Sequence, residues 1–182
     1  MSHSIDLDGI LEKLVLLQHY SLGSKSYCED RSVGSEKDIG DYELDKYWGW
    51  TKGIVSNFIL ECSIKQRVIQ DTFKDSESMF KTLDKNACEG LIIGEITKGN
   101  FELTLRESCN KIIHAVNVVP SWNTENPEFH YWSGKYHLTG MYNKLEWKIT
   151  LDIYQWAKAY EKFIELFEST DEFHDLGQDF IK

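Results

Sequence analysis

Polar and apolar residues near the middle of the chain alternate with the period of an amphipathic helix. Thr104 and Glu107 have the spacing of a capping box, which predicts that a helix begins directly after Thr104. Arg106, Asn110 and His114 then recur every four residues, so they form one polar stripe along that helix. The other side carries an apolar set, which we expect to face a core: Leu105, Cys109, Ile112, Ile113 and Val116.

Helical spacing recurs in the first half of the chain. It predicts a short first helix over 8–20 and a long helix over 42–73, and it indicates a shorter helix within 74–90. Gly49 and Gly53 lower the helix propensity of the long segment, so we expect a kink or a close helix contact there.

The pattern changes to a period of two in the segment 129–151, which predicts a β-hairpin with a short turn at Asn143 and Lys144. Asp152 and Gln155 follow it with the spacing of a second capping box, so a last main helix is expected to begin there.

Other segments lack helical periodicity. Residues 21–41 are rich in Ser, Gly and acidic side chains and are interpreted as a long surface loop. The segments 90–99 and 117–120 are expected to be extended. Residues 169–182 are interpreted as an acidic tail. The sequence therefore predicts one mainly α domain over 1–168, a helical bundle with a small antiparallel hairpin inserted before its last main helix.

Composition narrows the classes of protein that the chain fits. With 41% hydrophobic residues, the chain of 182 residues has enough apolar side chains for a proper core. No apolar run approaches the roughly 18 residues of a membrane helix, and the N-terminus lacks the pattern of a signal peptide, so a cytoplasmic protein without membrane attachment is expected. The net charge of −10 argues against loose binding to DNA or membranes.

Cofactor motifs are missing from the sequence. The four cysteines show no CxxC spacing, which argues against a zinc site, and His130 and His137 on the predicted hairpin do not suggest a metal site either. No P-loop, GxGxxG, GxSxG, HExxH or EF-hand spacing is present. We therefore expect neither a metal nor a cofactor.

The polar stripe carries groups suited to chemistry on RNA. A histidine can serve as general acid or base at neutral pH, and RNA supplies its own nucleophile in the 2′-hydroxyl. A metal-free ribonuclease needs such a base, a cation for the phosphate charge, and polar groups that position the backbone. The three residues of the stripe could equally form a structural ladder of hydrogen bonds.

An Asn110–His114 pair preceded by Arg106, late in a helical chain, resembles the motif of the HEPN superfamily of metal-independent ribonucleases. The segment 61–67 also resembles the long bundle helix that packs against the His-bearing helix in that family. The resemblance implies an endoribonuclease of toxin or phage-defence type with Arg106, Asn110 and His114 as catalytic residues. Under it, His114 acts on the 2′-hydroxyl, Arg106 stabilises the phosphate charge, and Asn110 positions the backbone. It further implies a homodimer with a composite site, RNA as substrate, and a protein partner or antitoxin.

Three basic residues are candidates for binding the substrate under this hypothesis: Lys65, Arg67 and Lys111. The charges at 61–67 either reach the stripe on the other helix or form a solvated face.

A second hypothesis keeps the architecture without the catalysis. Cys109 stands where the family motif has its Arg directly before Asn110, the chain is acidic, and no basic groove is evident. These features favour a catalytically inactive HEPN-like module for interaction or dimerisation.

Overall fold

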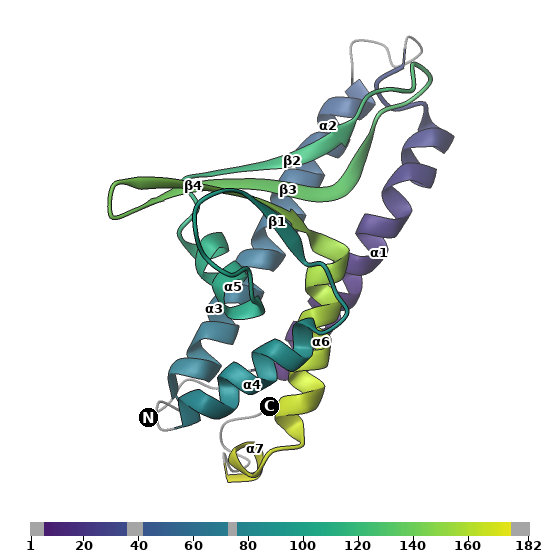
Figure 1. Ribbon diagram of the computed structural model, residues 1–182. Coiled ribbons are helices and arrows are strands. Elements are labelled where there is room, and N and C mark those ends of the chain that lie inside the picture. Colours follow the sequence, from purple (N-terminus) through teal and green to yellow (C-terminus); the bar gives the residue numbers. More distant parts are fainter. Residues whose placement is uncertain (1–5, 36–41, 73–75, 176–182) are drawn as a thin grey trace.

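The structure is a computed structural model that describes residues 6–35, 42–72 and 76–175 (Figure 1). Some predicted residues lie outside the described ones: 1–5 of the predicted domain, 36–41 of the predicted loop, Phe73 of the long helix, 74–75 of the segment with the shorter helix, and 176–182 of the predicted acidic tail.

Helices and strands follow one another along the chain in this order: α1 (Leu7–Arg31), α2 (Tyr42–Trp50), the π-helical turn η2 (Thr51–Val55), α3 (Ser56–Thr72), α4 (Glu77–Cys88), β1 (Gly94–Lys98), α5 (Leu105–Ile113), β2 (Asn117–Asn123), β3 (Tyr131–Tyr142), β4 (Leu145–Asp152), α6 (Ile153–Glu168) and α7 (Asp171–Asp175). The expected antiparallel hairpin before the last long helix is confirmed. It belongs to a four-stranded sheet, so the protein combines helices with a sheet of four strands rather than a hairpin alone.

The first helix is longer than the sequence predicts. It begins after Asp6, whose side chain accepts a hydrogen bond from the backbone N–H of Gly9 at 2.8 Å, and it continues to Arg31. The prediction of a loop over 21–41 is therefore wrong for 21–31. Tertiary contacts outweigh the weak helix propensity of its serines and glycine, because Ser24 accepts a hydrogen bond from the Trp132 backbone at 3.1 Å and Cys28 is fully buried.

The long helix predicted over 42–73 is continuous over its described residues, Tyr42 to Thr72. The irregularity expected near Gly53 is the π-helical turn η2, which accommodates one extra residue in the helix. The turn is held from two sides. The Tyr136 hydroxyl donates to the Thr51 carbonyl at 2.9 Å, and the Tyr20 and Thr51 hydroxyls are 3.2 Å apart.

The sheet has the strand order β1-β4-β3-β2, with each neighbouring pair antiparallel. Asn143 and Lys144 form the predicted turn, both with positive φ, as a two-residue hairpin turn requires. Residues 140–147 pair only with each other, because β1 ends beside Lys148 and β2 begins beside Thr139. This two-stranded end, the hairpin arm, projects to the left in Figure 1.

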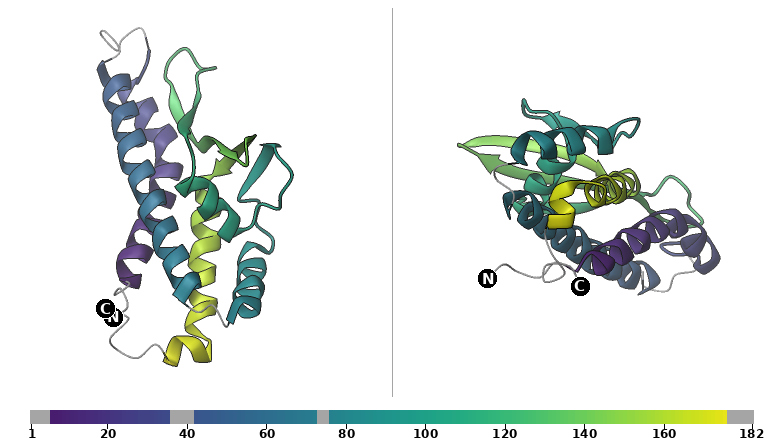
Figure 2. Two further views of the ribbon diagram at one scale, coloured as in Figure 1. Left: turned by 90° about the vertical axis from the view of Figure 1, so that its left-hand side faces the viewer. Right: turned by 90° about the horizontal axis from the view of Figure 1, so that it is seen from below.

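The helices cover one face of the sheet. Alternate side chains of β3 and β4 are buried against them, including Tyr136, Leu138 and Ile149. Helix α1 lies beside the α2–α3 helix, and the ion pair between Lys13 and Glu61 at 3.2 Å joins them (Figure 2). In the left view of Figure 2, helices α4, α5 and α6 lie to the right of this pair.

Candidate functional site

Helix α5 begins where the capping box predicts. The Thr104 hydroxyl accepts a hydrogen bond from the backbone N–H of Glu107 at 3.2 Å. The Glu107 carboxylate, however, accepts hydrogen bonds from the Asn110 amide at 3.0 Å and from the Lys111 ammonium at 2.9 Å. It therefore joins the polar stripe rather than completing the capping box.

Arg106, the first residue of the stripe, is held by three groups from neighbouring helices. Its guanidinium donates to the side-chain oxygen of Gln70 at 2.5 Å and contacts the Asp71 carboxylate at 3.2 Å. Its backbone N–H donates to the Asp84 carboxylate at 2.7 Å. These contacts fasten the start of α5 to the end of α3 and to α4.

Arg67 reaches the stripe from α3. Its guanidinium donates to the Asn110 side-chain oxygen and forms an ion pair with Asp71 at 3.0 Å. Asp71 therefore bridges Arg67 and Arg106. Burial acts to raise the pKa of Asp71, but hydrogen bonds from the two guanidinium groups outweigh it and leave the pKa below its usual value. Of the charges at 61–67, Arg67 therefore reaches the stripe on the other helix and is not part of a solvated face.

Lys65 and Lys111 differ from Arg67 in their surroundings. Lys65 pairs with Glu61 at 2.8 Å, and Glu61 also contacts Lys13 of α1, so Lys65 lies toward α1 and away from α5. Lys111 is buried, with its ammonium 4.1 Å from the centre of the Phe101 ring and 4.8 Å from that of Trp147.

His114 ends α5 as its C-cap residue and is exposed. It lines an open hollow of about 640 Å³ together with Glu107, Asn110, Lys111, Met141, Tyr142 and Trp147. The hollow lies between α5 and the hairpin arm. A Cβ atom on Gly140 would be 2.2 Å from the Trp147 ring and 2.9 Å from the His114 carbonyl oxygen, so glycine allows the arm to approach α5 closely.

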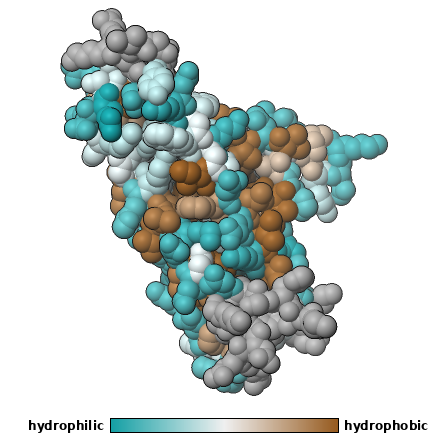
Figure 3. Space-filling model, turned by 180° about the vertical axis from the view of Figure 1, so that it is seen from behind, coloured by the Kyte–Doolittle hydropathy of each residue, from teal (hydrophilic) through white to brown (hydrophobic). Residues whose placement is uncertain are grey.

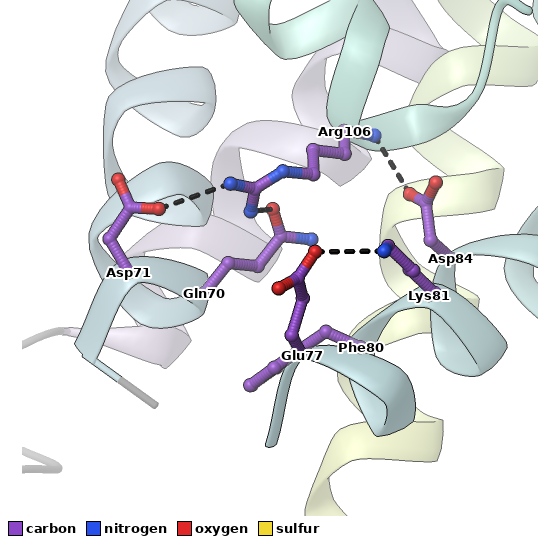
Figure 4. A pocket seen from close by; sticks show the side chains of 7 residues that line it. All are labelled: Gln70, Asp71, Glu77, Phe80, Lys81, Asp84 and Arg106. Atoms are coloured by element: carbon purple, nitrogen blue, oxygen red, sulfur yellow. Dashed lines mark hydrogen bonds and ion pairs between the residues drawn. The ribbon is translucent and has the colours of Figure 1, made fainter. Parts of the chain in front are cut away.

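The residues of the stripe therefore line two different hollows. Arg106 lines the other one, a space of about 280 Å³ between α3, α4 and α5, and neither hollow is lined by both Arg106 and His114 (Figure 4). Asn110 is tied to Arg67 and Glu107. The structure brings Arg106, Asn110 and Arg67 into one network, whereas His114 stands at its end with only its backbone N–H bonded, to the Asn110 carbonyl at 3.0 Å, among the hydrogen bonds found in the described residues.

Sequence reasoning missed several members of this region. Asp71 could have been found, because it follows Arg67 at the spacing of a helical ion pair. Gln70, Asp84 and Tyr142 carry no local signal, because their neighbours come from distant parts of the chain.

Buried titratable groups in the described part of the protein are shifted mainly by loss of solvent. Burial raises the pKa of Asp84 above its usual value, against the hydrogen bonds from Thr104 and the Arg106 backbone. Burial likewise raises the pKa of the Cys62 and Cys109 thiols to about 12, so neither is suited to act as a nucleophile.

The described ranges contain neither a cluster of metal ligands nor a membrane-spanning helix. No three His, Cys, Asp or Glu side chains within them are placed to hold a metal ion. No helix within them combines the length and apolar character needed to cross a bilayer.

Comparison of the chain with protein-family models, with curated proteins and with solved structures finds no match. The HEPN resemblance therefore stays a prediction.

Proposed function

We propose that this protein is a catalytically inactive, HEPN-like interaction module that pairs with a second copy of itself. The observation that carries the proposal is the state of the polar stripe. Arg106 and Asn110 are bound to Gln70, Asp71, Arg67 and Glu107 within the chain. A phosphate would have to displace those partners, so the stripe is better suited to joining α3 and α5 than to cleaving RNA.

The contact between α3 and α5 also supports the HEPN-like part of the proposal. The resemblance implies that the long helix packs against the His-bearing helix, and Arg67 and Gln70 of α3 make such contacts to α5. The four-stranded sheet is an addition to the expected bundle.

The hairpin arm supplies the interaction surface. Four apolar side chains lie at or beside it with exposed fractions of 55% to 80%, and we call them the arm cluster: Val116, Met141, Tyr142 and Leu145. A two-stranded ribbon is marginally stable in water by itself, and exposed apolar groups gain free energy when a partner covers them. The arm cluster borders the hollow beside His114, so a convex arm lies next to a concave surface.

The surface behind the molecule is a weaker candidate. Figure 3 shows apolar side chains over α1 and the α2–α3 helix, separated by polar ones. Most of the exposed apolar side chains on these helices are about half covered, for example Leu16, Ile54 and Leu60 at 44%, 41% and 40%, and Leu22 is the most exposed at 63%. Half-covered apolar residues are normal on a protein surface, whereas several strongly exposed ones on a single projecting element indicate an interface.

Dimerisation through the arm also fits the geometry of symmetric pairs. In a two-fold dimer the same surface is used by both copies, so the arm of each copy would cover the hollow of the other. A stable interface buries roughly 800 Å² on each partner, so the lining of the hollow must take part besides the arm cluster.

One observation favours metal-independent ribonuclease activity as a second candidate function. His114 is exposed at the edge of a hollow that also holds Lys111 and Glu107, and Tyr142 offers a 69% exposed ring on which a base could stack. In this second candidate Lys111 takes the role that the sequence assigned to Arg106.

Sedimentation equilibrium tests the dimer. We expect the wild type to dimerise at micromolar concentration, and the double variant Tyr142→Ser, Leu145→Ser to raise the dissociation constant at least about ten-fold, because each change removes apolar surface from the interface. Leu22→Ser is the matched control, since Leu22 is 63% exposed on α1 and lies away from the arm. A wild type that stays monomeric, or equal effects of the two variants, would contradict the proposal.

An RNA cleavage assay in EDTA distinguishes the two functions. The interaction module leaves RNA intact, and His114→Ala behaves like the wild type. EDTA-resistant cleavage that disappears in His114→Ala would establish the ribonuclease instead.

A further inference from the structure

The hollow beside Arg106 is separate from the proposed dimer surface. It measures about 280 Å³ and is lined by side chains of α3, α4 and the start of α5: Gln70, Asp71, Glu77, Phe80, Lys81, Asp84 and Arg106. Figure 4 shows these side chains arranged around a common space. Neither the arm cluster nor His114 is among them.

Gln70 has an unsatisfied donor in this hollow. The residue is 96% buried, taking its exposed fraction of 4%, and its side-chain oxygen accepts from Arg106 at 2.5 Å. Its side-chain nitrogen is buried without a hydrogen-bond partner. In Figure 4 this nitrogen is directed toward the ring of lining side chains. Because an amide nitrogen only donates, the missing partner is an acceptor oxygen.

The charges around the hollow are of both signs. Asp71, Glu77 and Asp84 supply three carboxylates, and Lys81 and Arg106 supply two cations, so the lining has one carboxylate in excess. Glu77 and Lys81 pair with each other at 2.8 Å on the surface. Asp84 is 6% exposed and accepts the backbone N–H of Arg106. A ligand with an anionic group would supply the acceptor that the Gln70 nitrogen lacks, and a cationic group on the same ligand would neutralise the Asp84 carboxylate.

We propose that this hollow binds a small zwitterion, a free α-amino acid. Its carboxylate accepts a hydrogen bond from the unpartnered Gln70 amide nitrogen, while Arg106 keeps its bonds to Gln70 and Asp71. Its ammonium group donates to the Asp84 carboxylate, and Phe80 provides an apolar wall for the side chain. A hollow of about 280 Å³ has room for a molecule of this size.

Binding is tested on the full chain by isothermal titration calorimetry with the standard L-amino acids, each added separately. At least one amino acid is expected to bind with a dissociation constant below the millimolar range. For that amino acid, the corresponding amine without the carboxylate and the corresponding acid without the amino group should each bind at least about ten-fold more weakly. No binding by any amino acid, or equal binding by the amine or the acid, overturns the proposal.

Two glutamines one helical turn apart provide matched variants. Gln66 and Gln70 are both buried with an unpartnered amide nitrogen, but only Gln70 is in the lining of this hollow. Gln70→Met is expected to weaken binding at least about ten-fold and Gln66→Met to leave it unchanged. Equal affinities of the two variants would overturn the proposal. The comparison of ligands on the wild type decides the question if either variant fails to fold.

Discussion

The two aspartates beside Arg106 have carboxyl pKa values that their surroundings shift in opposite directions. Asp71 lies at the surface between Arg67 and Arg106, and the pKa of its carboxyl is lowered in spite of partial burial. Asp84 lies in the interior on the other side of Arg106, and burial raises the pKa of its carboxyl. The two groups therefore contribute to the pH dependence of stability with opposite signs.

We predict opposite pH profiles for Asp71→Asn and Asp84→Asn. The stability that Asp71 contributes is fully present above its unfolded pKa and is lost as the pH falls through its lowered native pKa. The stability that Asp84 contributes is greatest below its unfolded pKa and decreases as the pH rises through its raised native pKa. Asp71→Asn should therefore lower the free energy of unfolding at neutral pH, by no more than about 1 kcal/mol because the pair is half exposed, and have no effect in acid.

Urea unfolding at several pH values measures both profiles. The free energy of unfolding of Asp84→Asn, taken relative to that of the wild type, should increase as the pH rises from acid to neutral. Parallel profiles for the two variants would contradict the assigned shifts.

At the scale of elements, the local signals of the sequence located ends and turns well. The side chains of Thr104 and Asp152 each cap a helix as the spacing predicts, and Asn143 and Lys144 turn the hairpin. These features depend on residues within four positions of each other. The second half of α1 depends on partners far along the chain, and so does the pairing of β1 and β2 with the hairpin. The sequence therefore predicted extended segments at 90–99 and 117–120 but not their place in one sheet.

The candidate site was predictable only in part for the same reason. The spacing correctly places Arg106 and Asn110 on one helix, but α5 ends at Ile113 with His114 as its C-cap. The expectation that Val116 continues the core-facing side is wrong, because the helix has ended and Val116 is 80% exposed. The spacing also could not show that α3 occupies the side of Arg106 and Asn110. Nor could it show that the hairpin arm stands beside His114.

Gly23→Ala tests the extended α1. Gly23 lies inside the helix, and a Cβ there meets nothing within 4 Å, so alanine should raise the free energy of unfolding by about 0.5–1 kcal/mol. Gly90→Ala is the contrasting control, because Gly90 also has open space around it but has a φ of +76°, which alanine adopts only with strain. Thermal and urea unfolding should show a gain for the first variant and a loss for the second; a loss for both would argue for a loop at Gly23.

Charge is distributed unevenly over the whole molecule. The chain carries a net charge of −10, yet the network between α3 and α5 holds three cations, Arg67, Arg106 and Lys111, against the carboxylates of Asp71 and Glu107. One local positive charge does little to offset the long-range repulsion between two acidic copies.

The proposed dimer should therefore tighten when salt is added. Raising the ionic strength shortens the range of charge repulsion and leaves apolar burial in place, so we expect the dissociation constant to fall several-fold between about 0.02 and 0.3 M salt. Binding to RNA would respond in the opposite direction, because added salt weakens phosphate contacts. Sedimentation and RNA-binding titrations over one salt series measure both responses, and a dimer that weakens with salt would contradict an apolar interface.

The π-helical turn η2 determines where the long helix can lose a residue. Upstream of it, Tyr47 and Trp48 contact Trp122 of β2, and downstream Gln70 contacts α5. Each residue turns a helix by about 100°, so deleting one residue from a regular helical stretch between these contacts would rotate the two contact faces relative to each other. The π-helical turn holds one residue more than an α-helical turn, so a deletion there leaves a regular α-helix and keeps both faces in register. What that deletion would lose is the pair of contacts that Thr51 makes with Tyr136 and Tyr20.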